Sequence, residues 1–191
     1  TTMQGMRFDP EIDFHTTRLI VGVIALSIAP LTSLLAVWQG AEPITSVSES
    51  YRVGGPARDV FVGFLFAIAA FLLSYNGRNL RNMLASKVAA LATVGVAIFP
   101  CACNTYQPDV PFAHVVSAVT MFLVLAYFCG SFYRRAVNKG HAQARMRAVV
   151  YAGSGIVMLV CIAVIAVDRA FGQVYAGQLP RFVFYAEAAA L

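Results

Sequence analysis

Long stretches without any charged residue dominate this sequence and limit what the chain can fold into. The first runs from Leu19 to Trp38 and has about the 20 residues that an α-helix needs to cross the hydrocarbon core of a bilayer. Similar stretches follow it, each bounded by basic residues or by turn residues. The pattern predicts an all-α integral membrane protein, a bundle of six transmembrane helices at roughly residues 19–38, 59–76, 83–99, 110–133, 147–167 and 180–191.

The composition also indicates a membrane protein. Apolar residues make up 59% of the chain and charged residues 12%, and the mean hydropathy is +0.71. This balance lies outside the range that is usual for a soluble domain. No linker or internal repeat divides the sequence, so we expect a single polytopic membrane domain over residues 1–191. The stretch 180–191 is too short to span a bilayer, and we expect it to be a truncated helix of a longer chain.

The distribution of positive charge predicts how the helices are oriented. The excess lies before the first stretch and in the loops that follow the second and the fourth: Arg7, Arg18, Arg78, Arg81, Lys87, Arg134, Arg135, Lys139, Arg145 and Arg147. The remaining loops hold only Arg52, Arg58, Arg169 and Arg181. Since cytoplasmic loops carry the excess of Lys and Arg, we expect a cytoplasmic amino terminus. The net charge of +5 is then a signal of topology. We expect no nucleic-acid partner, because no interleaved aromatic residues or binding motif accompany these loops.

Four polar side chains near the expected outer ends of the helices are candidates for a catalytic or binding site. They are Asp59, His114, Ser117 and Glu187. Ionisable groups at membrane depth are costly, which makes them functional candidates. Structural alternatives exist for the first two. Asp59 can cap the helix that it opens, and His114 can be a packed, hydrogen-bonding residue with Ser117 on the same helix face.

Glu187 lies in an apolar segment and is expected to face the bundle. Its candidate partners are Arg58, His114 and Arg181. A carboxylate and a histidine that meet inside a bundle can act as acid and base or bind a metal ion. They can equally form a satisfied polar plug that fixes how the helices pack.

Two cysteines in an expected outer loop give a second lead. Cys101 and Cys103 form a C-x-C pattern, and Asp109 and His114 follow within reach, so a Zn or Cu site is conceivable. The spacing differs from the usual C-x2-C pair of zinc sites and from haem attachment motifs. A disulfide is the alternative if the compartment is oxidising. We predict no cofactor, with Zn or Cu as the alternative.

Several enzyme signatures are absent from the sequence. It contains no Walker A loop, no G-x-S-x-G elbow and no H-E-x-x-H motif. No inverted repeat indicates a transporter. We therefore predict a noncatalytic membrane protein. It would be an accessory or interaction subunit that binds membrane lipids on its outer faces and associates with other integral membrane subunits.

Much of the sequence resembles known membrane proteins. The resemblance is carried by the segments SVSESYRVGGPARDVFVGFLFAIAAFLLSYNG, GVAIFP, HVVSAVTMFLVLAYF and FVFYAEAAAL. They are similar to a group of bacterial six-helix membrane proteins of a domain-of-unknown-function family, akin to Frag1-like and DRAM-like proteins. This resemblance implies a multi-pass protein of the bacterial cytoplasmic (inner) membrane, in which the final segment continues into a full helix. It brings no known activity.

A more distant similarity is to the CREST superfamily of membrane hydrolases, which includes alkaline ceramidases and adiponectin-receptor-like proteins. That similarity implies a Zn ion held by three His, with a Ser and an Asp nearby. Asp59, His114 and Ser117 lie at comparable helix ends, whereas the expected topology puts His15 and His141 on the cytoplasmic side. Two of the three ligands are therefore missing. The alternative function that follows is an outer-leaflet lipid hydrolase that uses Asp59 and His114.

Overall fold

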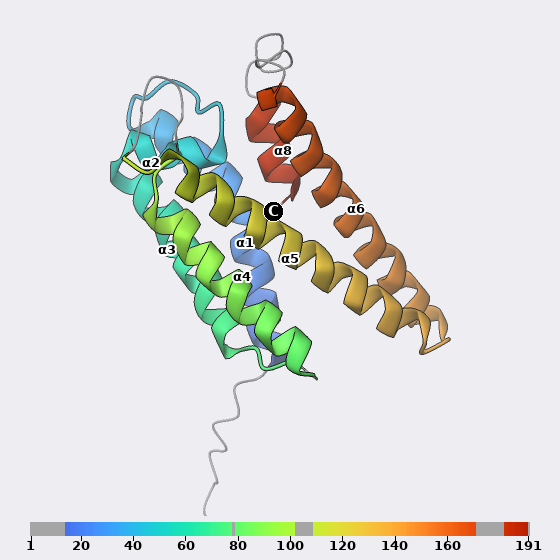
Figure 1. Cartoon of the computed structure of the whole chain (residues 1–191). Coiled ribbons are helices and arrows are strands. Elements are labelled where there is room, and N and C mark those ends of the chain that lie inside the picture. The colour runs from blue at the N-terminus through green and yellow to red at the C-terminus, as the bar shows by residue number, and fades with distance from the viewer. Residues whose placement is uncertain (1–13, 78, 102–108, 171–181, 191) are drawn as a thin grey trace, which may run out of the picture.

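All secondary-structure elements in the described part of the chain are helices. The computed structural model describes residues 14–77, 79–101, 109–170 and 182–190 (Figure 1). The long helices are α1 (Phe14–Trp38), α3 (Gly55–Ser74), α4 (Leu80–Ile98), α5 (Pro111–Val137) and α6 (Ala142–Ala170). The short elements are η1 (Val47–Glu49), α2 (Ser50–Val53) and α8 (Phe182–Ala190). The all-α class predicted from the sequence is confirmed.

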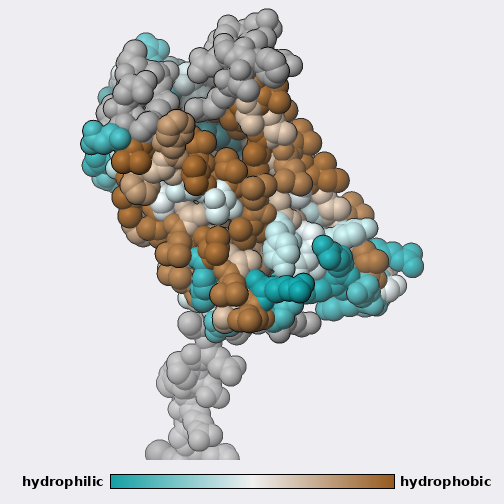
Figure 2. All heavy atoms as spheres, viewed as in Figure 1, coloured by the Kyte–Doolittle hydropathy of each residue, from teal (hydrophilic) through white to brown (hydrophobic). Residues whose placement is uncertain are grey.

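The five long helices are long and apolar enough to cross a membrane. Their apolar side chains cover the middle of the molecule, as the brown belt in Figure 2 shows. The structure therefore supports a multi-pass helical membrane protein. The described part of α8 has 9 residues, which is about 14 Å of helix. A sixth transmembrane helix stays a prediction, as does the orientation in the membrane.

The second expected helix begins earlier than the sequence indicated. It was expected over residues 59–76, but α3 begins at Gly55. The chain turns at Gly54, whose φ of 79° suits glycine, and Pro56 occupies the first turn, where its missing N–H costs no hydrogen bond. Asp59 consequently lies in the second turn of α3, and the expectation that it opens the helix is wrong.

The helices at the other end of the bundle extend past the expected limits. α5 continues to Val137 instead of ending at residue 133, and α6 begins at Ala142 instead of residue 147. Arg134 and Arg135 belong to the last turn of α5. Charged residues mark where a helix leaves the hydrocarbon, but they are compatible with helical structure in water. The charge pattern therefore did not predict the helix ends.

Each long helix packs chiefly against the next one along the chain. The contacts run from α1 to α3, then to α4, α5 and α6, and α8 returns to pack on α6. Of the five spans, α4 has the largest buried share. Its buried face consists of small residues, including Ala89, Ala90, Thr93 and Ala97. Small residues let helix backbones approach closely in a membrane, so α4 can sit between α3 and α5.

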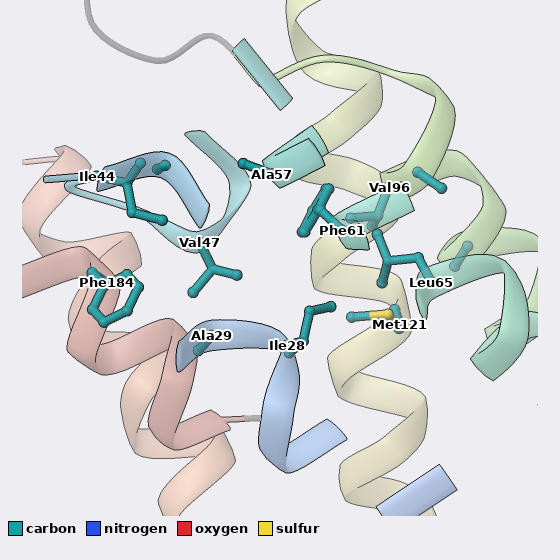
Figure 3. Packing of buried hydrophobic residues seen from close by; sticks show 13 residues of the cluster. Ile28, Ala29, Ile44, Val47, Ala57, Phe61, Leu65, Val96, Met121 and Phe184 are labelled. Carbon is teal, nitrogen blue, oxygen red and sulfur yellow. The ribbon is translucent and has the colours of Figure 1, made fainter. Parts of the chain in front are cut away.

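The largest apolar core lies at the end of the bundle that carries η1. We call this end, where α2 lies and where α3, α5 and α8 begin, the η1 end; the opposite end, at the connection from α5 to α6, is the basic end. In Figure 3 the side chain of Val47 from η1 points into a space bordered by Ile28 of α1, Phe61 of α3 and Met121 of α5. Helices distant in sequence therefore meet beneath η1.

Candidate functional site

Glu187 joins α8 to the segment that leads into η1. Its carboxylate accepts hydrogen bonds from the Ser46 hydroxyl at 2.9 and 3.0 Å, from the Val47 amide at 2.5 Å and from the Ser48 amide at 3.3 Å. These amides lie at the start of η1, where helical N–H groups have no partner in their own helix. Glu187 thus caps η1 from about 140 residues away in the sequence. Of the expected partners, Arg58 and His114 do not make these contacts, and Arg181 lies outside the described residues.

A second carboxylate holds the same segment from within. Glu49 is 3% exposed and accepts hydrogen bonds from the Thr45 amide at 2.7 Å, the Thr45 hydroxyl at 2.8 Å and Arg52 at 2.6 Å. Burial by itself raises the pKa of Glu49, but the hydrogen bonds from Arg52 and Thr45 and the Arg52 charge outweigh it, so the pKa lies below its ordinary value. The Phe184 amide also donates to the Thr45 carbonyl at 2.9 Å. Glu49, Glu187 and the backbone of α8 therefore hold residues 45–48 in place.

His114 completes the carboxyl end of α4. Its Nδ1 lies 2.8 Å from the carbonyl oxygen of Phe99, the residue after the last turn of α4. A carbonyl only accepts, so Nδ1 carries the hydrogen, and in the neutral ring Nε2 is the acceptor nitrogen. The Tyr51 hydroxyl donates to the neighbouring Ile98 carbonyl at 3.2 Å. His114 is 5% exposed. The imidazole thus satisfies a carbonyl that the helix itself leaves open.

Ser117 of α5 lies directly against Gly95 of α4. A Cβ atom added to Gly95 of α4 would lie 2.9 Å from the Cβ of Ser117, closer than real Cβ contacts. The glycine and the serine are therefore matched in size. This packing gives Ser117 a structural reason to be small, independent of any reaction.

Asp59 stands apart from the other candidates. Its side chain is 69% exposed and lies 3.6 Å from the Arg58 guanidinium. An exposed pair of this kind contributes little to stability. The structure does not bring Asp59 to the side chains around His114, as the hydrolase alternative requires.

His114 and Glu187 line the same cavity. It has a volume of about 160 Å³. Its polar rim comes from the η1 end, with Ser46, Ser48, Cys101, His114 and Glu187, and its other walls are apolar side chains of α1, α3, α4, α5, α6 and α8. Asp59 and Ser117 are not part of the lining. Two of the four predicted side chains are therefore brought together.

The cavity reaches deep into the bundle. Ile28 of α1, Leu65 of α3 and Met121 of α5 all line it, and each lies ten residues from the η1 end of its helix. Ten helical residues correspond to roughly 15 Å. That is about half of the ~30 Å hydrocarbon thickness of a bilayer. The lining of the cavity thus extends about half a bilayer thickness from the η1 ends of these helices.

The described residues do not assemble a metal centre. Among them, no group of three His, Cys, Asp or Glu side chains could hold a metal ion. Cys101 is disulfide-bonded, and its Sγ lies 3.5 Å from the Ser48 carbonyl oxygen. A disulfide sulfur lacks the thiolate charge that binds Zn or Cu. Cys103 lies outside the described residues. A metal site formed by Cys101, Cys103 and His114 stays a prediction without support from this geometry.

The candidates chosen from the sequence did not include the loop residues Ser46, Glu49 and Tyr51. A signal was present, because Ser46 to Glu49 forms the S-x-x-E pattern of a capping box. In the structure Glu49 reaches back to the Thr45 amide, one residue before the expected position. The pattern therefore indicated a short helix here, but it could not indicate that Glu187 caps it.

A comparison with protein-family models, curated proteins and solved structures found no match for this chain. The function is therefore inferred from the geometry of the cavity and of the η1 end. The relationships to Frag1-like and DRAM-like proteins and to the CREST superfamily stay predictions.

Proposed function

We propose that this is a noncatalytic membrane protein that holds the hydrocarbon part of a lipid-like amphiphile in the cavity beneath η1. The observation that carries the proposal is the polarity of the cavity, which is polar at the η1 end and apolar along the rest of its depth. An amphiphile has the same division between its headgroup and its chain. A depth of roughly one leaflet suits a chain that enters from one side of the membrane.

The size of the cavity favours part of a lipid over a whole ligand. An apolar cavity of about 150 Å³ can bind a benzene-sized molecule, and this cavity has about 160 Å³. Pockets that enclose drug-sized ligands measure about 300–1,000 Å³. A section of an acyl chain therefore fits inside, with the headgroup at the rim near Ser46 and His114.

The roles of the polar residues support binding over hydrolysis. His114 Nδ1 is engaged by the Phe99 carbonyl, Ser117 packs against Gly95, and Asp59 does not line the cavity. A hydrolase would need an acid, a base or a metal ion within hydrogen-bond reach of the scissile bond. Membership in a larger integral complex stays a prediction, and mass spectrometry of what copurifies with the protein in mild detergent is its test.

Photocrosslinking tests the proposal directly. The protein is reconstituted with a phospholipid whose acyl chain carries a diazirine, irradiated and digested, and the labelled residues are located by mass spectrometry. We expect label on the α5 and α6 residues that line the cavity, such as Phe122 and Ile162.

A pair of variants in α5 separates the cavity from the outer surface. Val119 lines the cavity, whereas Val116 is 61% exposed and does not. Val119→Phe should fill the cavity and remove the label on Phe122 and Ile162. Val116→Phe should leave that label unchanged. Equal labelling in both variants would show that the probe reacts only from the surrounding lipid, and the proposal would be wrong.

A further inference from the structure

The basic end of the bundle carries a cluster of positive charge that the proposed cavity does not involve. We call Arg134, Arg135, Lys139, Arg145 and Arg147 the basic turn; they lie where α5 ends and α6 begins. All are exposed except the half-buried Arg135, whose guanidinium carbon lies 5.7 Å from the ring centre of Phe132. Figure 2 shows hydrophilic side chains gathered at this end, directly below the apolar belt.

No carboxylate neutralises the basic turn from its own helices. Residues 110–167 contain no Asp and no Glu. At the η1 end, by contrast, the Arg52 guanidinium lies 2.6 Å from Glu49, and the Arg58 guanidinium lies 3.6 Å from Asp59. Neither pair involves the basic turn. Among the described residues, therefore, Arg52 and Arg58 at the η1 end have carboxylate partners, whereas no ion pair joins a carboxylate to the basic turn.

The local structure explains only part of the cluster. Arg134 and Arg135 lie in the last turn of α5, where the partial negative charge of the helix end favours cations. Arg145 and Arg147 lie in the first two turns of α6, where the helix end is partly positive and no acidic residue occurs in the first turn. The start of α6 therefore does not favour a cation at Arg145, and the effect of the helix end has fallen off at Arg147 in the second turn.

The surroundings of the basic turn indicate which kind of anion it would bind. Exposed apolar side chains adjoin the basic turn on both helices, with Val137 on α5 and Met146, Val149 and Val150 on α6. These side chains continue the exposed apolar surface of α5 and α6, which are long and apolar enough to cross a membrane. If that surface faces hydrocarbon, the basic turn at its edge lies at the level of the lipid headgroups. In a membrane, the anions concentrated at that level are the phosphates of acidic lipids.

We propose that the basic turn binds the headgroups of anionic phospholipids. Arg145 and Arg147 contribute most to the preference for anionic lipid, because neither of them pairs with a carboxylate among the residues that the structure describes. Each Lys or Arg close to an anionic membrane surface contributes a factor of roughly five in affinity. Removing both charges should therefore weaken the binding of anionic lipid about 25-fold.

Native mass spectrometry of the full chain in detergent micelles tests this proposal. Phosphatidylglycerol and phosphatidylcholine with identical acyl chains are titrated separately. We expect tighter binding of phosphatidylglycerol, about fivefold weaker in Arg145→Gln and about 25-fold weaker in Arg145→Gln/Arg147→Gln. The matched control Arg58→Gln removes one charge at the η1 end and should leave the affinity unchanged. Arg145→Lys/Arg147→Lys keeps both charges and should retain the preference, which separates charge from folding.

Three results would overturn the proposal. Equal affinities for phosphatidylglycerol and phosphatidylcholine would show that the charge of the headgroup does not determine binding. A loss of the same size in Arg58→Gln and Arg145→Gln would show that net charge, and not the basic turn, decides. Displacement of phosphatidylglycerol by an equal concentration of inorganic phosphate would show a site for free anions instead of lipids.

Discussion

Replacing Gly95 by alanine tests the close crossing of α4 and α5 and the packing role of Ser117. The added Cβ would lie 2.9 Å from the Cβ of Ser117, which is attached to the α5 backbone and cannot rotate away. The two helices would have to separate slightly. Overpacking of this kind costs about 1–3 kcal/mol.

Any Gly→Ala substitution in a helix is also affected by the intrinsic preference for alanine over glycine, so the control must be another helical Gly→Ala substitution. That preference is worth about 1 kcal/mol and acts in the opposite direction. Gly63 in α3 provides the control, because no atom lies within 4 Å of the Cβ that would be added there. Gly63→Ala should be neutral or stabilising. Gly95→Ala should therefore be less stable than Gly63→Ala by about 1–3 kcal/mol.

The free energy of unfolding can be followed by circular dichroism while sodium dodecyl sulfate is titrated into dodecyl maltoside micelles. Adding Ser117→Gly to Gly95→Ala removes the clashing Cβ and should restore most of the difference. In a double-mutant cycle this appears as a coupling energy of about 1 kcal/mol or more. Additive effects of the two substitutions, or equal stability of Gly95→Ala and Gly63→Ala, would refute the close crossing.

Three further predictions concern the η1 end. Glu187→Ala should leave its hydroxyl and amide donors without their acceptor and cost about 2–4 kcal/mol; hydrogen exchange should then quicken at the Val47 amide but not in the control Glu42→Ala. Because the pKa of Glu49 is lowered on folding, its stabilisation is present above its ordinary pKa and lost as the pH falls through the lower folded value. Melting curves from pH 7 down to acid should therefore show a smaller loss in Glu49→Gln than in the wild type. His114→Ala should cost about 1–3 kcal/mol because the Phe99 carbonyl loses its donor, and unchanged chemical denaturation would contradict this role.

The sequence predicted the elements whose cause is local. An uncharged apolar run such as 19–38 specifies a transmembrane helix without reference to the rest of the chain, and α1 ends at Trp38 as expected. Helix ends were predicted less well where water allows the helix to continue. The extra turns contain Arg134, Arg135 and Arg145, and these charges interrupt the apolar stretches from which the helix limits were predicted.

The candidate site was predicted in part, and its contacts were not. His114 and Glu187 were selected because an ionisable group at membrane depth is costly and is therefore a functional candidate. Both residues line the cavity. Asp59 was selected by the same rule, but the early start of α3 leaves it exposed. The capping of η1 by Glu187 joins residues about 140 positions apart. Such a contact depends on how helices that are distant in the sequence pack together, and no local pattern encodes it.

A shared arrangement at two helix ends explains several polar residues without invoking chemistry. At the end of α3, the Ser86 hydroxyl and the Lys87 ammonium group of α4 donate to the carbonyls of Leu72 and Leu73. At the end of α4, His114 of α5 does the same for Phe99. In each case the donor lies on the next long helix, 14 or 15 residues after the carbonyl that it satisfies.

The cause is physical, because the last carbonyls of a helix near hydrocarbon cannot rely on water and need a donor from the next helix. Polar residues in this position should therefore first be interpreted as caps of the preceding helix. Glu187 does not fit that pattern, since it is an acceptor and caps the start of η1. Because its carboxylate also lines the cavity, any movement of α8 that opens the cavity must break the bonds to Ser46 and Val47. If the cavity takes up a lipid chain as proposed, a movement of α8 away from η1 during uptake would also release the cap on η1.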